Sequence, residues 1–115
     1  MLFRSDKIII ALWARPDWMI GEENDERFMP RYVQYVQAVA SHLNVTNLSN
    51  KISFEIWNEP AFFGTKGNVS DLPFVNNAMF YEVMLSYYNL LSSSYDAIKS
   101  INPNFEVISA AFTRP

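Results

Sequence analysis

The order of hydrophobic segments constrains the fold of this chain more than any other feature of the sequence. Three short apolar runs have the length and β-branched content of buried strands: "KIIIALWA" (7–14), "ISFEIW" (52–57) and "FEVISAAF" (105–112). Two longer segments, at about 30–43 and 77–100, lie between them and carry apolar residues every three or four positions, as amphipathic helices do. The predicted order is strand, helix, strand, helix, strand. Crossovers of this kind join parallel strands, so we expect an α/β fold with a parallel sheet.

Turn-forming residues and apolar spacing refine the two predicted helices. Pro30 fits the first turn of the first helix, where its missing N–H is not needed. The tripeptide "NPN" at 102–104 predicts the end of the second helix. The predicted buried stripe of that helix comprises Phe80, Met84, Tyr87, Leu91, Tyr95 and Ile98. Its other tyrosines, Tyr81 and Tyr88, are also expected to be packing residues.

The predicted sheet is incomplete. Three parallel strands with two helices leave both sheet edges unpaired and one face thinly covered. The sequence also stops at Arg114 and Pro115, directly after the third strand. We therefore expect residues 1–115 to form one incomplete domain, a piece of a larger α/β barrel or doubly wound sheet.

Composition excludes several function classes. Half of the 115 residues are hydrophobic, which is enough for a core, and the net charge of −3 offers no clustered basic face for nucleic acid. The chain has no cysteine and one histidine, and its carboxylates are scattered, so we expect no metal site and no cofactor. No apolar run approaches the roughly 20 residues that span a bilayer, so we expect no membrane insertion.

The cellular compartment stays open. The N-terminal sequence "MLFRSDK" lacks the pattern of a signal peptide, which is expected of a cytoplasmic protein or of a chain whose true N-terminus lies upstream. Three glycosylation sequons, at Asn44, Asn47 and Asn68, would instead fit a secreted or lysosomal protein.

The second strand ends in an unusual polar sequence, "FEIWNEP" (54–60). Side chains alternate along a strand, so one face should carry Ile52, Phe54 and Ile56. The other face should carry Ser53, Glu55, Trp57 and, if the alternation continues, Glu59. Sites in α/β barrels gather at the carboxyl ends of the strands, which makes Glu59 a candidate for chemistry. The alternative is that Glu59 is only a polar strand end.

Aromatic residues gather near the same predicted strand ends. Trp13 and Arg15 alternate at the end of the first strand, Trp18 lies just beyond, and Phe62 follows the second strand. A tryptophan at a pocket rim can stack on a sugar ring while its N–H remains free to donate. The predicted substrate contacts are Trp13, Arg15, Trp18, Trp57 and Phe62. For each of them the alternative is packing or a surface charge.

These motifs resemble those of the clan A glycoside hydrolases, which are (β/α)8 TIM barrels. In that clan an Asn-Glu pair, often followed by Pro, ends the fourth strand, as in "FEIWNEP". The helix-like "RYVQYVQAVASHL" and the passage "AIKSINPNFEVI" follow the family order, so the resemblance covers about strands three to five. It is closest to family 39 (xylosidase and iduronidase type) or family 5 (cellulase type). It implies a glycosidase that hydrolyses O-glycosidic bonds in oligo- or polysaccharides with retention.

The resemblance also implies roles for individual residues. Glu59 would be the general acid/base and Asn58 would bind the sugar 2-hydroxyl. The family nucleophile is a second Glu on the seventh strand, which is expected to be missing here. Glu55 lies about 13 Å back along the strand, too far for a pair that needs about 5–5.5 Å. We expect Glu55 to be a charge inside the barrel that pairs with a basic group from another strand.

The sequence of this chain is compatible with three hypotheses about its function. In the first, it is part of a glycosidase and inactive alone, unless the missing part of the barrel is supplied as a partner. In the second, it is a non-catalytic carbohydrate-binding remnant of such a barrel. In the third, it is an unrelated α/β piece with a chance motif.

Overall fold

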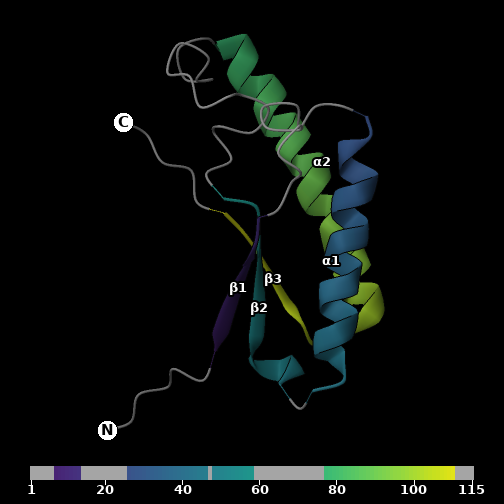
Figure 1. Cartoon of the computed structure of the whole chain (residues 1–115). Helices are drawn as coiled ribbons and strands as arrows, with labels where there is room; N and C mark the ends of the chain where they lie inside the picture. The colour runs from purple at the N-terminus through teal and green to yellow at the C-terminus, as the bar shows by residue number, and fades with distance from the viewer. Residues whose placement is uncertain (1–6, 14–25, 47, 59–76, 111–115) are drawn as a thin grey trace, which may run out of the picture.

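The computed structural model arranges the chain in two layers, a sheet and a pair of helices (Figure 1). It describes residues 7–13, 26–46, 48–58 and 77–110. Within them the elements are β1 (Ile8–Leu12), α1 (Phe28–Asn44), the 3-10 helix η2 (Ser49–Lys51), β2 (Ile52–Ile56), α2 (Asn77–Ile101) and β3 (Glu106–Ser109). The predicted order of strands and helices is confirmed.

The strands form one parallel sheet in the order β1-β2-β3. Ile8 of β1 is opposite Ile52 of β2, and Ser53 of β2 is opposite Glu106 of β3. Helices α1 and α2 lie side by side against the same face of this sheet (Figure 1). The structure is thus a small mixed α/β domain of the β-α-β-α-β type.

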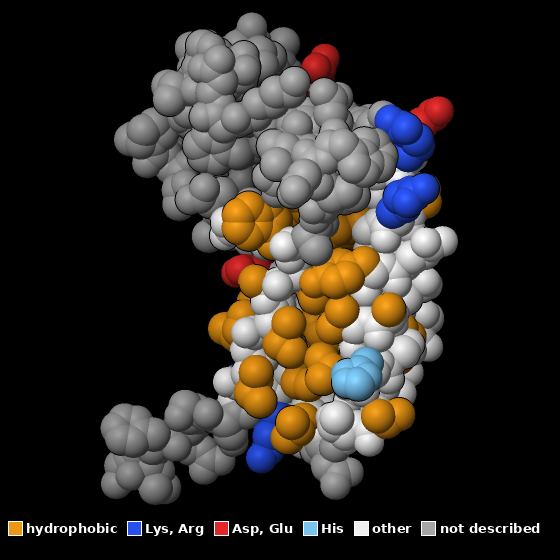
Figure 2. Space-filling model, viewed as in Figure 1, with side chains coloured by type: hydrophobic (Ala, Val, Ile, Leu, Met, Phe, Trp, Pro, Cys, Tyr) orange, Lys and Arg blue, Asp and Glu red, His pale blue; other side chains and the backbone are white. Residues whose placement is uncertain are grey.

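The central strand β2 forms the floor of the hydrophobic core. Ile52, Phe54 and Ile56 point toward the helices and are almost fully buried, as their alternation predicted. The ring of Phe54 meets the ring of Phe105 edge to face, with 5.1 Å between centroids. Figure 2 shows apolar side chains filling the space between the strands and α1.

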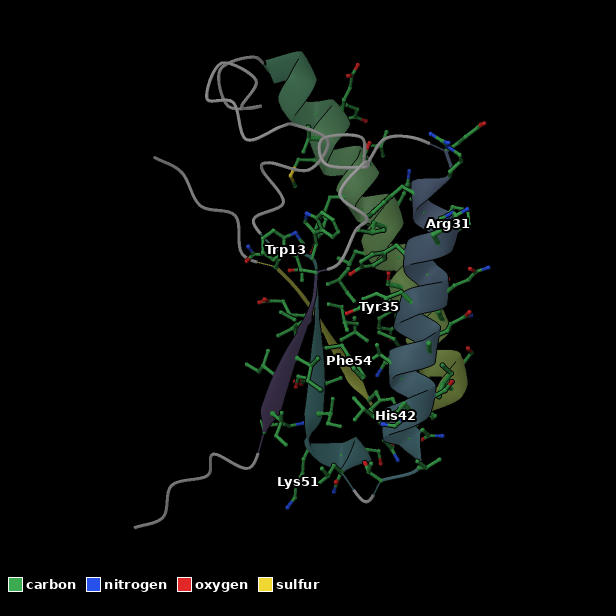
Figure 3. The ribbon with its side chains drawn as sticks, in the orientation of Figure 1. Trp13, Arg31, Tyr35, His42, Lys51 and Phe54 are labelled. Carbon is green, nitrogen blue, oxygen red and sulfur yellow. The ribbon has the colours of Figure 1, made fainter. Side chains whose placement is uncertain are left out.

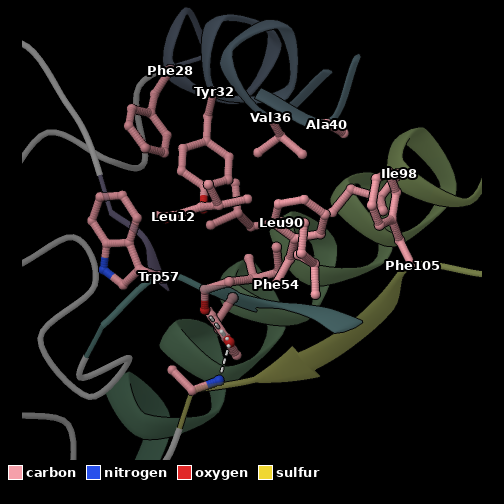
Figure 4. Packing of buried hydrophobic residues seen from close by; sticks show 14 of the residues in the cluster. Leu12, Phe28, Tyr32, Val36, Ala40, Phe54, Trp57, Leu90, Ile98 and Phe105 are labelled. Atoms are coloured by element: carbon pink, nitrogen blue, oxygen red, sulfur yellow. Dashed lines mark hydrogen bonds between the residues drawn. The ribbon is translucent and has the colours of Figure 1, made fainter. Parts of the chain in front are cut away.

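Helix α1 presents a regular apolar stripe to that core. It begins at Phe28, so Pro30 falls in its first turn as predicted. Its buried residues recur every four positions and lie in one row over the sheet (Figure 4): Phe28, Tyr32, Val36 and Ala40.

The stripe predicted for α2 is correct in part. Tyr87 and Ile98 are buried, but the expectation that Tyr81, Tyr88 and Tyr95 pack in the interior is wrong, because all three are exposed. The buried line of this helix comprises Val83, Tyr87, Leu90, Ser94, Ala97 and Ile98. Small side chains at Ser94 and Ala97 fit a helix that packs closely on both a sheet and a neighbouring helix, whereas a tyrosine there would hold the elements apart. The large side chains therefore turn outward.

The second face of the sheet has no helix over it within the described part of the chain. On β1, Ile9 is 63% exposed and Ala11 is exposed as well. On the neighbouring strands Ser53 is buried and donates a hydrogen bond to the Glu106 carboxylate, and Glu55 is half-buried. The predicted basic partner of Glu55 is not among the described residues.

A compact turn connects α2 to β3 and explains why the helix ends where it does. The side-chain oxygen of Asn102 accepts a hydrogen bond of 2.9 Å from the backbone N–H of Asn104. Lys99 donates to the backbone oxygens of Pro103 at 3.1 Å and of Phe105 at 2.6 Å. A basic residue in the last helical turn also suits the negative end of the helix dipole.

Replacement of Phe54 tests how far the domain depends on its central strand. Phe54→Ala removes a side chain that is 0% exposed, and we expect a loss of about 3–5 kcal/mol in the free energy of unfolding, measured by urea denaturation. The matched control is Ile9→Ala on the uncovered face, which should change stability by less than about 0.5 kcal/mol. Equal losses in the two variants would contradict this assignment of the core.

Candidate functional site

The carboxyl ends of the three strands meet at one edge of the sheet, and each is tied to a helix by a tyrosine. The Tyr32 hydroxyl, from α1, donates to the backbone oxygen of Leu12 at the end of β1. The Tyr87 hydroxyl, from α2, donates to the backbone oxygen of Ile56 at 2.7 Å and accepts from the N–H of Ala110 at 2.9 Å. Tyr87 therefore links the ends of β2 and β3. Polar backbone groups left over at the strand ends are satisfied inside the core.

The backbone at Trp57 breaks the regular course of the central strand. Trp57 has a φ angle of 71°, in the left-handed region that a bulky residue seldom adopts. Its N–H donates to the backbone oxygen of Leu12 at 3.2 Å, so the strand turns toward the end of β1. The residue that follows is Asn58, which is partly exposed.

This turn places the Trp57 indole on the helix side of the sheet, where it is 2% exposed. Its ring packs edge to face on Phe28 at 5.5 Å and on Tyr32 at 5.7 Å between centroids (Figure 4). The expectation that Trp57 shares the face of Glu55 is therefore wrong. The alternation stops because the left-handed residue rotates the chain out of the pleat.

Trp13 supplies the exposed part of this aromatic group. It follows β1 directly, and its ring lies edge-on to that of Trp57 with 6.5 Å between centroids. Unlike Trp57, it is 50% exposed. We call these four residues, Trp13, Phe28, Tyr32 and Trp57, the aromatic cluster.

The structure brings together part of the predicted site. Trp13, Trp57 and Asn58 lie at the same end of the sheet, one exposed, one buried and one partly exposed. The remaining predicted residues, Arg15, Trp18, Glu59 and Phe62, lie outside the described residues.

Sequence reasoning missed three residues at this end of the sheet. Tyr87 is predicted only as a packing residue, Tyr32 only as part of the first predicted helix, and Phe28 lies before the predicted start of that helix at about residue 30. The spacing of apolar residues along a helix shows which positions are buried. It does not show which buried tyrosine has a hydroxyl that bonds to a strand end. The available signal was the pair of tyrosines itself, because a buried hydroxyl usually requires a hydrogen-bond partner.

The two tyrosines are neutral hydrogen-bond donors in this setting. Burial raises the pKa of Tyr32 well above its ordinary value, and the nearby Trp57 backbone N–H only partly opposes the change. Burial also raises the pKa of Tyr87, against the hydrogen bond from Ala110. Both hydroxyls therefore hold the strand ends in place and exchange no proton near neutral pH.

Comparisons with known proteins leave the family open. No protein-family model, curated protein or solved structure gives a significant match to this chain. The fold places the described residues in the class of small α/β domains, with three parallel strands and two α-helices. No helix in the described ranges is both long and apolar enough to cross a membrane. Among the same residues, no three His, Cys, Asp or Glu side chains are grouped so that they could hold a metal ion.

Removal of the Tyr87 hydroxyl tests the link between β2 and β3. Tyr87→Phe leaves the Ile56 carbonyl and the Ala110 N–H buried without their partner, and we expect a loss of about 1–3 kcal/mol in the free energy of unfolding. Tyr88→Phe, on the exposed side of the same helix, is the matched control and should have no measurable effect. An unchanged urea midpoint for Tyr87→Phe would show that the link does not stabilise the fold.

The raised pKa of Tyr32 predicts a loss of stability in alkali. Because the folded state favours the neutral phenol, its contribution is fully present below the unfolded pKa of about 10 and is lost as pH rises above that value. We expect the stability of the unmodified chain to fall faster above pH 10 than that of Tyr32→Phe. The difference should reach at most about 1.4 kcal/mol per pH unit in urea titrations. Parallel curves would contradict the assignment.

Proposed function

We propose that this chain is part of the (β/α)8 catalytic barrel of a retaining glycoside hydrolase, with Glu59 as general acid/base and Asn58 as the contact to the sugar 2-hydroxyl. The observation that carries the proposal is the left-handed backbone of Trp57, directly before Asn58 and Glu59. Bulky residues in such conformations cost about 1–3 kcal/mol and cluster at active sites. Trp57 lies at the carboxyl end of a parallel strand, and barrel enzymes have their active sites at these strand ends.

The aromatic cluster supports the proposal because it makes the region beside the end of β2 apolar. Trp57, Phe28 and Tyr32 form an apolar wall beside the end of β2. A general acid must stay protonated at neutral pH, and apolar surroundings favour the protonated carboxyl. We propose that Glu59 is held near such surroundings in the whole barrel.

The proposed reaction uses two carboxyl groups. The Glu59 acid gives its proton to the glycosidic oxygen as the bond between that oxygen and the anomeric carbon breaks, and a second carboxylate bonds to that carbon. Glu59, now a carboxylate, takes a proton from water as the water displaces the second carboxylate. We propose that the second carboxylate comes from a strand outside β1, β2 and β3, because Glu55 is too far back along β2.

A carbohydrate-binding module without hydrolysis is the second candidate, and Trp13 favours it. Its half-exposed ring, braced edge-on by Trp57, has the arrangement of a platform for a sugar ring. We propose Arg15, Trp18 and Phe62 as further sugar contacts of this candidate, on the basis of the sequence alone. Binding through Trp13 is common to both candidates, and hydrolysis belongs to the first.

Replacement of Glu59 tests the catalytic proposal. In the longest protein that contains these 115 residues, Glu59→Gln should lower kcat on aryl β-glycosides by about 10²- to 10⁴-fold, because protonation of the leaving group is lost. The effect should be smallest for substrates whose phenol leaves without protonation. Glu82→Gln, on the exposed surface of α2, is the matched control and should retain full activity.

Binding and turnover separate the two candidates. We expect the 115-residue chain to bind oligosaccharides saturably in titration calorimetry, to lose that binding in Trp13→Ala, and to release no product. If the longest protein also binds without turnover, the binding module is the correct function. If it hydrolyses glycosides and Glu59→Gln leaves the rate unchanged, the assignment of Glu59 is wrong.

A further inference from the structure

The proposed function gives no role to the three N-glycosylation sequons of the sequence. One of them, Asn44-Val45-Thr46, lies wholly within the described residues, at the end of α1. Asn44 is exposed, and the next residue, Val45, is 84% exposed. The motif is therefore accessible from solvent in the folded chain.

The hydrogen bonds around Asn44 leave the reactive atom free. The Asn44 oxygen Oδ1 accepts a hydrogen bond of 2.8 Å from the side chain of Asn102. The nitrogen Nδ2, to which a glycan is attached, donates to none of the described groups. A substituent on Nδ2 would thus leave the contact with Asn102 intact.

The place of Asn44 in the fold keeps a glycan away from the candidate site. Helix α1 runs from Phe28, in the aromatic cluster, to Asn44, and its 17 residues span about 24 Å. Figure 3 shows His42 and Lys51 near this end of the strands and Trp13 at their opposite end. The connector that follows α1 is held locally, because the Thr46 hydroxyl donates to the Leu43 oxygen at 2.6 Å and accepts from the Leu48 N–H at 3.3 Å.

We propose that Asn44 is an N-glycosylation site. The donor would be an oligosaccharide linked to a lipid through pyrophosphate. A bond forms between the sugar anomeric carbon and Asn44 Nδ2, the bond from that carbon to phosphate breaks, and the lipid pyrophosphate leaves as the amide gives up one proton. The glycan also covers Val45, an apolar side chain that water otherwise surrounds. This inference is independent of the proposed glycosidase activity.

Synthesis of the chain in the presence of rough microsomes tests the proposal directly. The 115 residues are translated behind a cleavable secretory leader, treated with an amidase that releases N-glycans in ¹⁸O water, and mapped by mass spectrometry. We expect Asn44 to be recovered as ¹⁸O-labelled Asp in most molecules. Thr46→Val, which keeps the side-chain shape but removes the hydroxyl, should abolish the label, and Thr46→Ser should restore it. Unlabelled Asn44, or label at Asn47 in its place, would overturn the proposal.

A second measurement tests the structural part of the inference. The glycosylated chain and the same chain made without microsomes, in which Asn44 is unmodified, should have the same urea midpoint, because Asn44 is exposed and its contact with Asn102 survives. Both should also bind oligosaccharides equally, if the chain binds them at all. A midpoint that falls on glycosylation would show that Asn44 is not compatible with a glycan in the folded state. Loss of sugar binding in both forms would concern only the proposed function.

Discussion

Burial of the central strand β2 is the interaction on which the rest of this structure depends. Ile52, Phe54 and Ile56 lie beneath both helices, and together they form the floor of a single core. The strands of a parallel sheet are usually buried, because the helices that connect them pack on the faces of the sheet. Here both described helices pack on one face, so the apolar side chains that hold the domain together lie between that face and the helices. The other face carries a different set of residues, with Ser53, Glu55 and Glu106 among them.

The same burial makes the tyrosine links necessary. At the carboxyl ends of the strands, backbone carbonyls and N–H groups leave the sheet while they are still inside the core. Such groups cost about 1–3 kcal/mol each when they lack a partner. Tyr32 and Tyr87 satisfy Leu12, Ile56 and Ala110 from the helix side. The helices therefore fix the positions of the strand ends as well as covering the sheet, and any site at this edge inherits that rigidity.

The sequence predicted the elements of this fold well and their detailed orientation less well. The periods of two and of about 3.6 in apolar residues placed β2, α1 and α2 within two residues of their observed ends, because these patterns report burial directly. The face of α2 was harder to predict, because the close packing of this helix requires the small side chains of Ser94 and Ala97 to be buried, and an apolar spacing does not mark small residues as core positions. The candidate site could be predicted only as far as its position at the strand ends. The hydroxyl contacts of Tyr32 and Tyr87 join residues at least 20 positions apart, and no local pattern contains them.

Trp57 shows why the alternation of a strand cannot be extended past its last paired residue. Its left-handed backbone costs about 1–3 kcal/mol, and a tryptophan would not adopt it without compensation. That compensation is visible in the aromatic cluster, where edge-to-face contacts of this kind contribute about 0.5–1.5 kcal/mol each beyond the burial of the rings. The three contacts of Trp57 together are of the same order as this strain. The aromatic residues of α1 thus hold the end of β2 in a conformation that its own sequence disfavours, and the direction in which Asn58 leaves the sheet is set by packing on a helix that begins 30 residues earlier.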